Sequence, residues 1–155
     1  MNQRDTASRT ALREWLTDNS KCFQYAATLT LTNAYASAAG AQTVARRFHH
    51  KFNKAIWGGN RCHTHKIAWL AVVHGDEFKR YHVHAAIGNI PQALHFFPAL
   101  QRFKRTFRHT EGTWQRMDFW PIETDGWCDY MTRVIRDGSD TAVMLDELEL
   151  GTGNR

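Results

Sequence analysis

Two histidines, His82 and His84, flank a single valine in the apolar stretch YHVHAAI at residues 81–87. Alternate residues of a β-strand point to the same face, so a strand here would place both imidazoles side by side. Paired imidazoles bind divalent transition-metal ions well. The spacing therefore predicts a metal site, while a polar edge without metal would explain the same pair.

A third histidine, His74, ends the apolar run that precedes this strand. If the strands predicted over 66–75 and 80–89 pair as a hairpin, His74 lies across from the histidine pair. We therefore expect His74 to be the third ligand, with Asp76 and Glu77 in the turn as alternatives.

The segment DYMTRVIRDG at residues 129–138 carries a candidate nucleophile on a predicted helix. Tyr130, Arg133 and Arg136 follow one another at three-residue intervals, which puts them along one side of that helix. A tyrosine hydroxyl can attack a phosphodiester when a metal ion polarises the phosphate and cations stabilise the developing charge. A core or interface aromatic residue is the alternative role for this tyrosine.

The elements that must position these residues follow from the apolar pattern. Strands are expected over 22–32, 66–75, 80–89 and 113–123, and helices over 10–19, 37–58, 92–107 and 125–138. Pro98 would limit or kink the third helix. This order predicts an α+β fold, with a central, mostly antiparallel sheet of four to five strands flanked by helices.

The length of 155 residues suits one domain over 1–155, with a core at about 22–138 and an acidic C-terminal tail at 139–155. The sequence has no apolar run of the roughly 20 residues that a membrane span needs, and its start lacks the apolar core of a signal peptide. Three widely spaced cysteines favour a reduced setting over a disulfide framework. We therefore expect a cytoplasmic protein.

The chain is basic, with a net charge of +5. Lysine and arginine gather at 45–54, 77–82 and 101–109, where they alternate with aromatic residues. Such a mixture can pair with phosphates and stack on bases, although solvated helix faces would explain it equally well.

Three segments in order, TLTLT at 28–32, YHVHAAI at 81–87 and DYMTRVIRDG at 129–138, resemble the motifs of the HUH endonuclease superfamily. That superfamily includes rolling-circle replication initiators (Rep), relaxases and single-strand transposases. The resemblance covers about residues 22–138 and implies an HUH/Rep-like, ferredoxin-related fold.

The resemblance also implies roles for individual residues. In the viral initiators, a carboxylate eight positions before the first motif histidine completes the metal site, and here that position is His74. The implied cofactor is a divalent cation, Mn²⁺ or Mg²⁺, and a third imidazole favours Mn²⁺. Tyr130 matches the single nucleophile, and Arg133 stands where the family has lysine, so the charge is kept without the compact ammonium.

The implied function is metal-dependent, site-specific nicking and joining of single-stranded DNA through a 5′-phosphotyrosine intermediate, which initiates rolling-circle replication. The expected DNA-binding residues are Thr28, Thr30, Thr32, Lys79, Arg80 and Arg136. The expected partners are single-stranded DNA, including a hairpin origin, and a host or partner helicase and polymerase, with no membrane. A bacterium, phage or plasmid is the expected source.

Three alternatives remain open at this point. The first is a single-tyrosine HUH transposase, which shares the same chemistry. The second is a non-catalytic protein that binds single-stranded nucleic acid through tryptophan and phenylalanine side chains. The third is a metal-binding regulator built on the histidine cluster.

Overall fold

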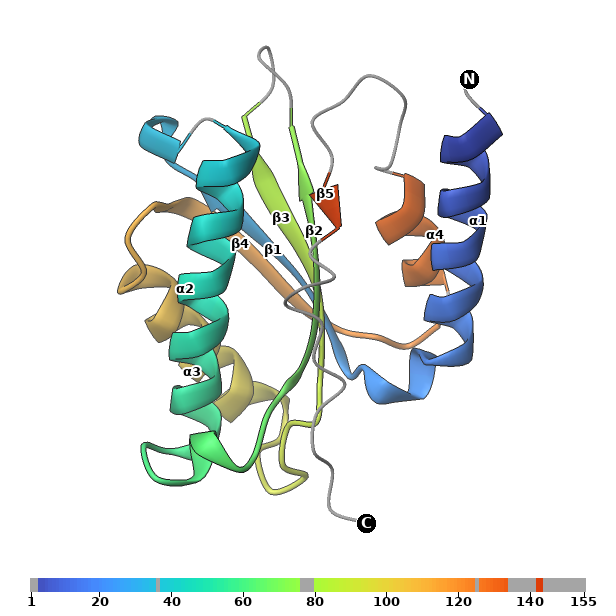
Figure 1. Cartoon of the computed structure of the whole chain (residues 1–155). Helices are drawn as coiled ribbons and strands as arrows, with labels where there is room; N and C mark the ends of the chain where they lie inside the picture. The colour runs from blue at the N-terminus through green and yellow to red at the C-terminus, as the bar shows by residue number, and fades with distance from the viewer. Residues whose placement is uncertain (1–2, 36, 76–79, 125, 134–141, 144–155) are drawn as a thin grey trace.

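A five-stranded antiparallel sheet with helices on both faces forms the centre of the molecule (Figure 1). The computed structural model describes residues 3–35, 37–75, 80–124, 126–133 and 142–143. The strands are β1 (Tyr25–Leu31), β2 (Ala68–His74), β3 (His82–Gly88), β4 (Thr113–Pro121) and β5 (Ala142–Val143), in the spatial order β4-β1-β3-β2-β5. The predicted α+β class, with a sheet of four to five strands, is confirmed.

The helices are α1 (Gln3–Asp18), α2 (Ala38–Trp57), α3 (Phe96–Arg108) and α4 (Gly126–Arg133). Three short 3-10 turns, η1 (Ser20–Cys22), η2 (Asn33–Tyr35) and η3 (Arg61–His63), join the larger elements. In Figure 1, α2 and α3 cover one face of the sheet, and α1 and α4 cover the other. No helix in the described ranges is both long and apolar enough to cross a membrane.

Each face of the sheet has its own apolar core. On the α2–α3 face, Trp69 of β2 and Val83 of β3 are fully buried with Phe48. On the α1–α4 face, Leu70 of β2 is fully buried with Leu16. Because β2 is covered on both faces, it reads as an apolar run rather than an alternating one, as predicted for a central strand.

Local signals define α2 well. The Ser37 side chain accepts a hydrogen bond from the Gly40 amide at 3.0 Å, which satisfies one of the free N–H groups of the first turn. Gly58 ends the helix with φ +80°, a conformation that favours glycine. The predicted apolar stripe is buried, including Val44 and Phe52.

Two predicted helix starts are wrong. The third helix begins at Phe96 rather than at 92, which places Pro98 in its first turn. The N–H that proline lacks would have no acceptor within the helix at that position, so Pro98 does not interrupt α3. Helix α1 begins at Gln3 rather than at 10, in a polar segment that carries no apolar periodicity.

The predicted acidic tail contributes to the sheet. Strand β5, which was not predicted, pairs its backbone with Val72 and Val73 of β2. This pairing covers part of an edge that would otherwise expose backbone hydrogen-bonding groups. Residues 134–141 and 144–155, with the expected helix end at Gly138, lie outside the described residues.

Candidate metal and nucleophile site

Three histidines form a row across β2 and β3. The strands pair antiparallel with the Cα of His74 opposite that of His82, so the hairpin pairing expected from the sequence is present. The ring centroids are 5.1 Å apart for His74 and His82 and 4.7 Å apart for His82 and His84, with each pair edge to face. The row lies on the sheet face that α1 and α4 cover, because Val72 and Ala86, at alternate positions of the same strands, belong to the core on that face.

His84 is the buried member of the row, with 3% of its surface exposed. Its Nδ1 lies 3.1 Å from Oγ1 of Thr28, which is its cross-strand neighbour on β1. Within the described part of the chain, its Nε2 is buried without a hydrogen-bond partner. With the proton on Nδ1, His84 donates to Thr28 and keeps the Nε2 lone pair available.

Burial, followed by the charges of His82 and His74, lowers the pKa of His84 to about 3. The imidazole is therefore neutral near pH 7. A neutral imidazole is the form that binds a metal ion.

His82 has a fixed tautomer. Its Nδ1 donates to the backbone oxygen of Arg80 at 3.1 Å, so the lone pair is on Nε2. Histidines that bind metals usually donate their second ring nitrogen in this way, because the hydrogen bond orients the ring. Both His82 and His84 thus have one nitrogen engaged and the other suited to a metal ion.

The donor atoms do not converge as they stand. Among the described residues, no three His, Cys, Asp or Glu side chains are placed so that they could hold one metal ion. The imidazoles instead contact one another edge to face, so a shared ion would require side-chain rotation in the row. The chemistry of these residues nevertheless fits a divalent ion. The Nε2 of His84 is buried without a hydrogen-bond partner among the described residues, and the Nδ1 atoms of His84 and His82 form hydrogen bonds that orient the rings. The alternative ligands Asp76 and Glu77 lie outside the described residues.

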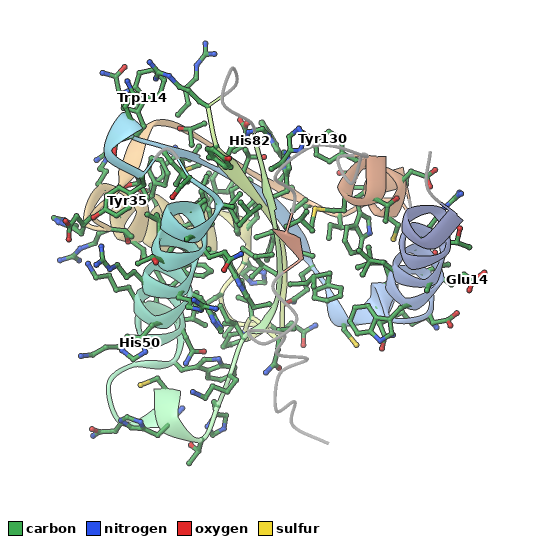
Figure 2. The ribbon with its side chains drawn as sticks, turned by 45° about the horizontal axis from the view of Figure 1, so that its top comes forward. Glu14, Tyr35, His50, His82, Trp114 and Tyr130 are labelled. Carbon is green, nitrogen blue, oxygen red and sulfur yellow. The ribbon has the colours of Figure 1, made fainter. Side chains whose placement is uncertain are left out.

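Tyr130 lies next to this row. Its ring is edge-on to that of His84, with centroids 5.0 Å apart and planes at 81°. The side chain is 52% exposed, so a ligand can approach the hydroxyl from solvent. His84 and Tyr130 are far apart in the sequence, and the fold brings their rings together. Figure 2 shows Tyr130 near His82 of the same row.

The other three tyrosines are less suited to act as a nucleophile. Tyr25 and Tyr81 are buried, with 8% and 5% exposure. Tyr35 donates to Glu111 at 2.8 Å and accepts from Arg47 at 3.1 Å, away from the histidine row. Tyr130 alone combines exposure with contact to a histidine of the row.

The opposite side of α4 holds Tyr130 in place. Trp127, Cys128 and Met131 are buried against α1 and the sheet, at the spacing of one helix face. Asp129 also forms an ion pair with Arg13 of α1 at 2.7 Å. The sequence predicted both helices but contains no signal that pairs these two residues.

Of the other predicted DNA-binding residues, Thr30 also lies beside the row, because its Cα pairs with that of His82. Its hydroxyl donates to the backbone oxygen of Arg116 on β4, and Thr32 follows the end of β1. Arg133 is the last residue of α4, but its side chain is outside the described part of the structure. Lys79 and Arg136 lie entirely outside it.

Sequence reasoning missed two features near the row. The Cα of Thr28 on β1 pairs with that of His84 on one side and with that of Asp118 on β4 on the other. The exposed carboxylate of Asp118 is therefore two strands away from His84, in the same cross-strand row. The Arg80 guanidinium also lies 3.7 Å from the ring centre of Trp114. The alternating pattern of the sequence predicted the strand that carries Asp118 and Trp114. Their neighbours on other strands are known only from the pairing register in the structure.

No family model, curated protein or solved structure matches the chain.

Proposed function

We propose that the protein is a metal-dependent single-stranded DNA endonuclease and strand transferase with Tyr130 as its nucleophile. The contact between Tyr130 and His84 carries this proposal, because it joins an exposed phenol to a row of potential metal ligands. The resemblance of the three sequence motifs to HUH endonucleases supports the same chemistry.

In the proposed step, Tyr130 Oη attacks the phosphorus of a phosphodiester in single-stranded DNA. A bond forms between Oη and phosphorus, and the bond from phosphorus to the 3′-oxygen breaks. The phenolic proton passes to solvent, and the departing 3′-oxygen takes up a proton. The products are a 5′-phosphotyrosine and a free 3′-hydroxyl, and attack by a 3′-hydroxyl reverses the step without an external energy source.

The histidine row would hold the cation. His82 and His84 offer Nε2 atoms, and His74 extends the row on β2. When bound, a divalent cation polarises the scissile phosphate and stabilises the charge that develops on it. The all-nitrogen set favours Mn²⁺ over Mg²⁺. Arg133, one turn after Tyr130, supplies a further positive charge to the same phosphate.

The biological role that fits this reaction is the initiation of rolling-circle replication. Nicking leaves a 3′-hydroxyl that a polymerase extends, while the protein stays attached to the 5′ end until a second transfer rejoins the strand. In this role the substrate is a specific single-stranded site, such as a hairpin origin, and a helicase and polymerase are the partners.

End-labelled oligonucleotides test the reaction and its polarity together. The purified chain is incubated with Mn²⁺ and a pool of single-stranded oligonucleotides labelled at either the 3′ or the 5′ end, and the products are separated on a denaturing gel. Because the protein keeps the 5′-phosphate, the 3′ label should move to the protein and the 5′ label should not. The transfer should require Mn²⁺.

Two variants distinguish the nucleophile from another tyrosine. Tyr130→Phe should abolish label transfer, and the control Tyr35→Phe should leave it intact. Transfer of the 5′ label, or transfer that survives in Tyr130→Phe, would overturn the proposed chemistry. DNA binding without label transfer, with the gene's own flanking DNA included in the pool, would support a binding protein instead.

A further inference from the structure

An open groove lies between the C-terminal half of α3 and the edge strand β4. Its volume is about 860 Å³, and its walls come from α3 residues 104, 107 and 108 and from β4 residues 113–118. In the described part of the chain, no strand pairs with the outer edge of β4. The groove is thus accessible along one side of the sheet.

The groove is predominantly basic. Lys104, Arg108 and Arg116 line it, against one carboxylate, Asp118. None of the three cations forms an ion pair with another described side chain. Cations without protein partners are suited to an external polyanion, whose bound counterions they replace.

An aromatic side chain stands in the same wall. Trp114 is 37% exposed and lines the groove, whereas Trp120, the more exposed indole of the same strand at 64%, does not line it. The guanidinium of Arg80 lies 3.7 Å from its ring centre, so the indole already accepts a planar group as a stacking partner. Unpaired nucleobases stack on exposed aromatic rings in the same manner, whereas the bases of a duplex are already stacked on one another.

Arg80 joins the groove to the histidine row. Its side chain contacts Trp114, and its backbone oxygen accepts the hydrogen bond from His82 Nδ1. Figure 2 shows Trp114, His82 and Tyr130 along the same end of the molecule. A nucleic-acid strand lying in the groove at Trp114 would therefore be one residue, Arg80, away from a contact of the histidine row.

We propose that this groove binds the segment of single-stranded DNA that adjoins the scissile phosphate. Lys104, Arg108 and Arg116 contact successive phosphates, and one base stacks on Trp114 beside Arg80. This inference rests on the proposed function for the identity of the strand, and it adds where that strand runs and which residues bind it.

Fluorescence anisotropy tests the groove separately from the reaction. All variants carry Tyr130→Phe, so that no covalent product forms, and the probe is a labelled oligonucleotide of about 20 nucleotides, longer than a typical single-strand site. Combined Lys104→Glu, Arg108→Glu and Arg116→Glu should weaken binding at least tenfold. The plot of log Kd against log salt concentration should lose about 0.7 of its slope per phosphate contact removed.

The matched control reverses the charge of three exposed cations far from the groove: Lys21→Glu, Lys54→Glu and Arg61→Glu. They lie on η1, at the end of α2 and on η3, at the opposite end of the sheet in Figure 1. This variant has the same net charge as the groove variant and should bind DNA with no more than a small loss. If both variants lost DNA affinity equally, only the overall charge would matter, and the groove would not be the binding site.

Trp114→Ala tests the stacking contact, and Phe97→Ala is its control because Phe97 is a 71% exposed aromatic at the other end of α3. Trp114→Ala should weaken binding by about tenfold, the effect expected for one stacked base. Unchanged DNA affinity in both Trp114→Ala and the groove charge-reversal variant would overturn the proposal that the groove binds DNA, even if label transfer to Tyr130 occurs. If binding depended on the groove residues but the catalytically intact protein transferred no label, the groove would stand as a DNA-binding site and the proposed nuclease activity would be rejected.

Discussion

The ring of Tyr130 on α4 stands edge-on to the ring of His84 on β3, with centroids 5.0 Å apart. This relationship depends on α4 being held against the sheet, because no strand pairing fixes it. The buried residues Trp127 and Met131 provide that hold from the other side of the helix. The position of the proposed nucleophile is therefore a consequence of core packing around α4.

Met131→Ala should both destabilise the protein and slow the reaction. Met131 is 2% exposed, so its truncation leaves a cavity and should lower the free energy of unfolding by about 2–5 kcal/mol. Looser packing of α4 should also reduce the rate of label transfer to Tyr130. Urea unfolding and transfer kinetics measure the two effects.

The control for this prediction is Asp129→Ala, which removes the partly exposed ion pair between α4 and Arg13 of α1. An exposed ion pair contributes about 1 kcal/mol or less, so this variant should be nearly as stable as the wild type. A larger loss in Asp129→Ala than in Met131→Ala would contradict the view that the apolar contacts hold α4.

Thr28→Val should weaken metal binding without changing the fold. Valine has nearly the shape of threonine but cannot form the hydrogen bond with His84 Nδ1, so the ring loses its orientation. Loss of such a supporting contact typically costs about 10- to 100-fold in metal affinity. Isothermal titration with Mn²⁺ measures the change, and Thr28→Ser should restore affinity because it keeps the hydroxyl. Wild-type affinity in Thr28→Val would show that Thr28 does not position His84.

Mn²⁺ should raise the unfolding temperature of the wild type. An ion that binds only the folded state adds about 2.7 kcal/mol of stability at 100 times its Kd. His82→Ala should abolish the increase, whereas His63→Ala, which changes an exposed histidine of η3, should retain it. Thermal unfolding with Mn²⁺ and with a chelator measures the difference, and an equal increase in His82→Ala would place the ion elsewhere.

Acid should destabilise the protein partly through His49, which stacks on Trp69 in the core with ring centroids 5.1 Å apart. Burial, followed by the charges of Lys66 and His50, lowers the pKa of His49 from 6.5 to about 4. The unfolded chain therefore binds a proton that the folded chain does not between these two values. Its contribution to stability is present above pH 6.5 and is lost as the pH falls to about 4, with a total of at most about 3 kcal/mol.

His49→Phe isolates this contribution, because phenylalanine keeps the aromatic contact with Trp69 and does not titrate. The free energy of unfolding, measured with urea from pH 7 to pH 4.5, should fall less steeply in His49→Phe than in the wild type. Identical slopes would mean that His49 does not titrate differently in the folded and unfolded chains.

The sequence predicts the histidine row well because the row depends on local geometry. Strand alternation places His82 and His84 on one face, and a hairpin between neighbouring segments brings His74 opposite them. The apolar stripe and the glycine end signal predicted α2 for the same reason, since each lies within one helix or next to it.

Features that depend on non-local pairing could not be predicted in this way. The strand order puts β1 between β3 and β4, and this order places Thr28 against His84 and Asp118. The register of β1 and β4 also shifts between Leu29, which pairs with Met117, and Leu31, which pairs with Thr113. Alternation still predicts the correct face for residues near Trp114, but it cannot predict their cross-strand partners. The family resemblance implied that Tyr130 acts beside the metal site, and no periodicity did so. Its ring contact with His84 is seen only in the structure.

Mass mapping of the covalent product tests the central claim most directly. Trypsin separates the tyrosines, because cleavage at lysine and arginine yields peptides 22–46 with Tyr25 and Tyr35, 81–102 with Tyr81, and 117–133 with Tyr130. After reaction with Mn²⁺ and single-stranded DNA, followed by nuclease and trypsin digestion, a nucleotide mass should appear on Tyr130 in peptide 117–133. A nucleotide on Tyr25, Tyr35 or Tyr81, or an unmodified peptide 117–133 from a protein that has cleaved its DNA, would contradict the account.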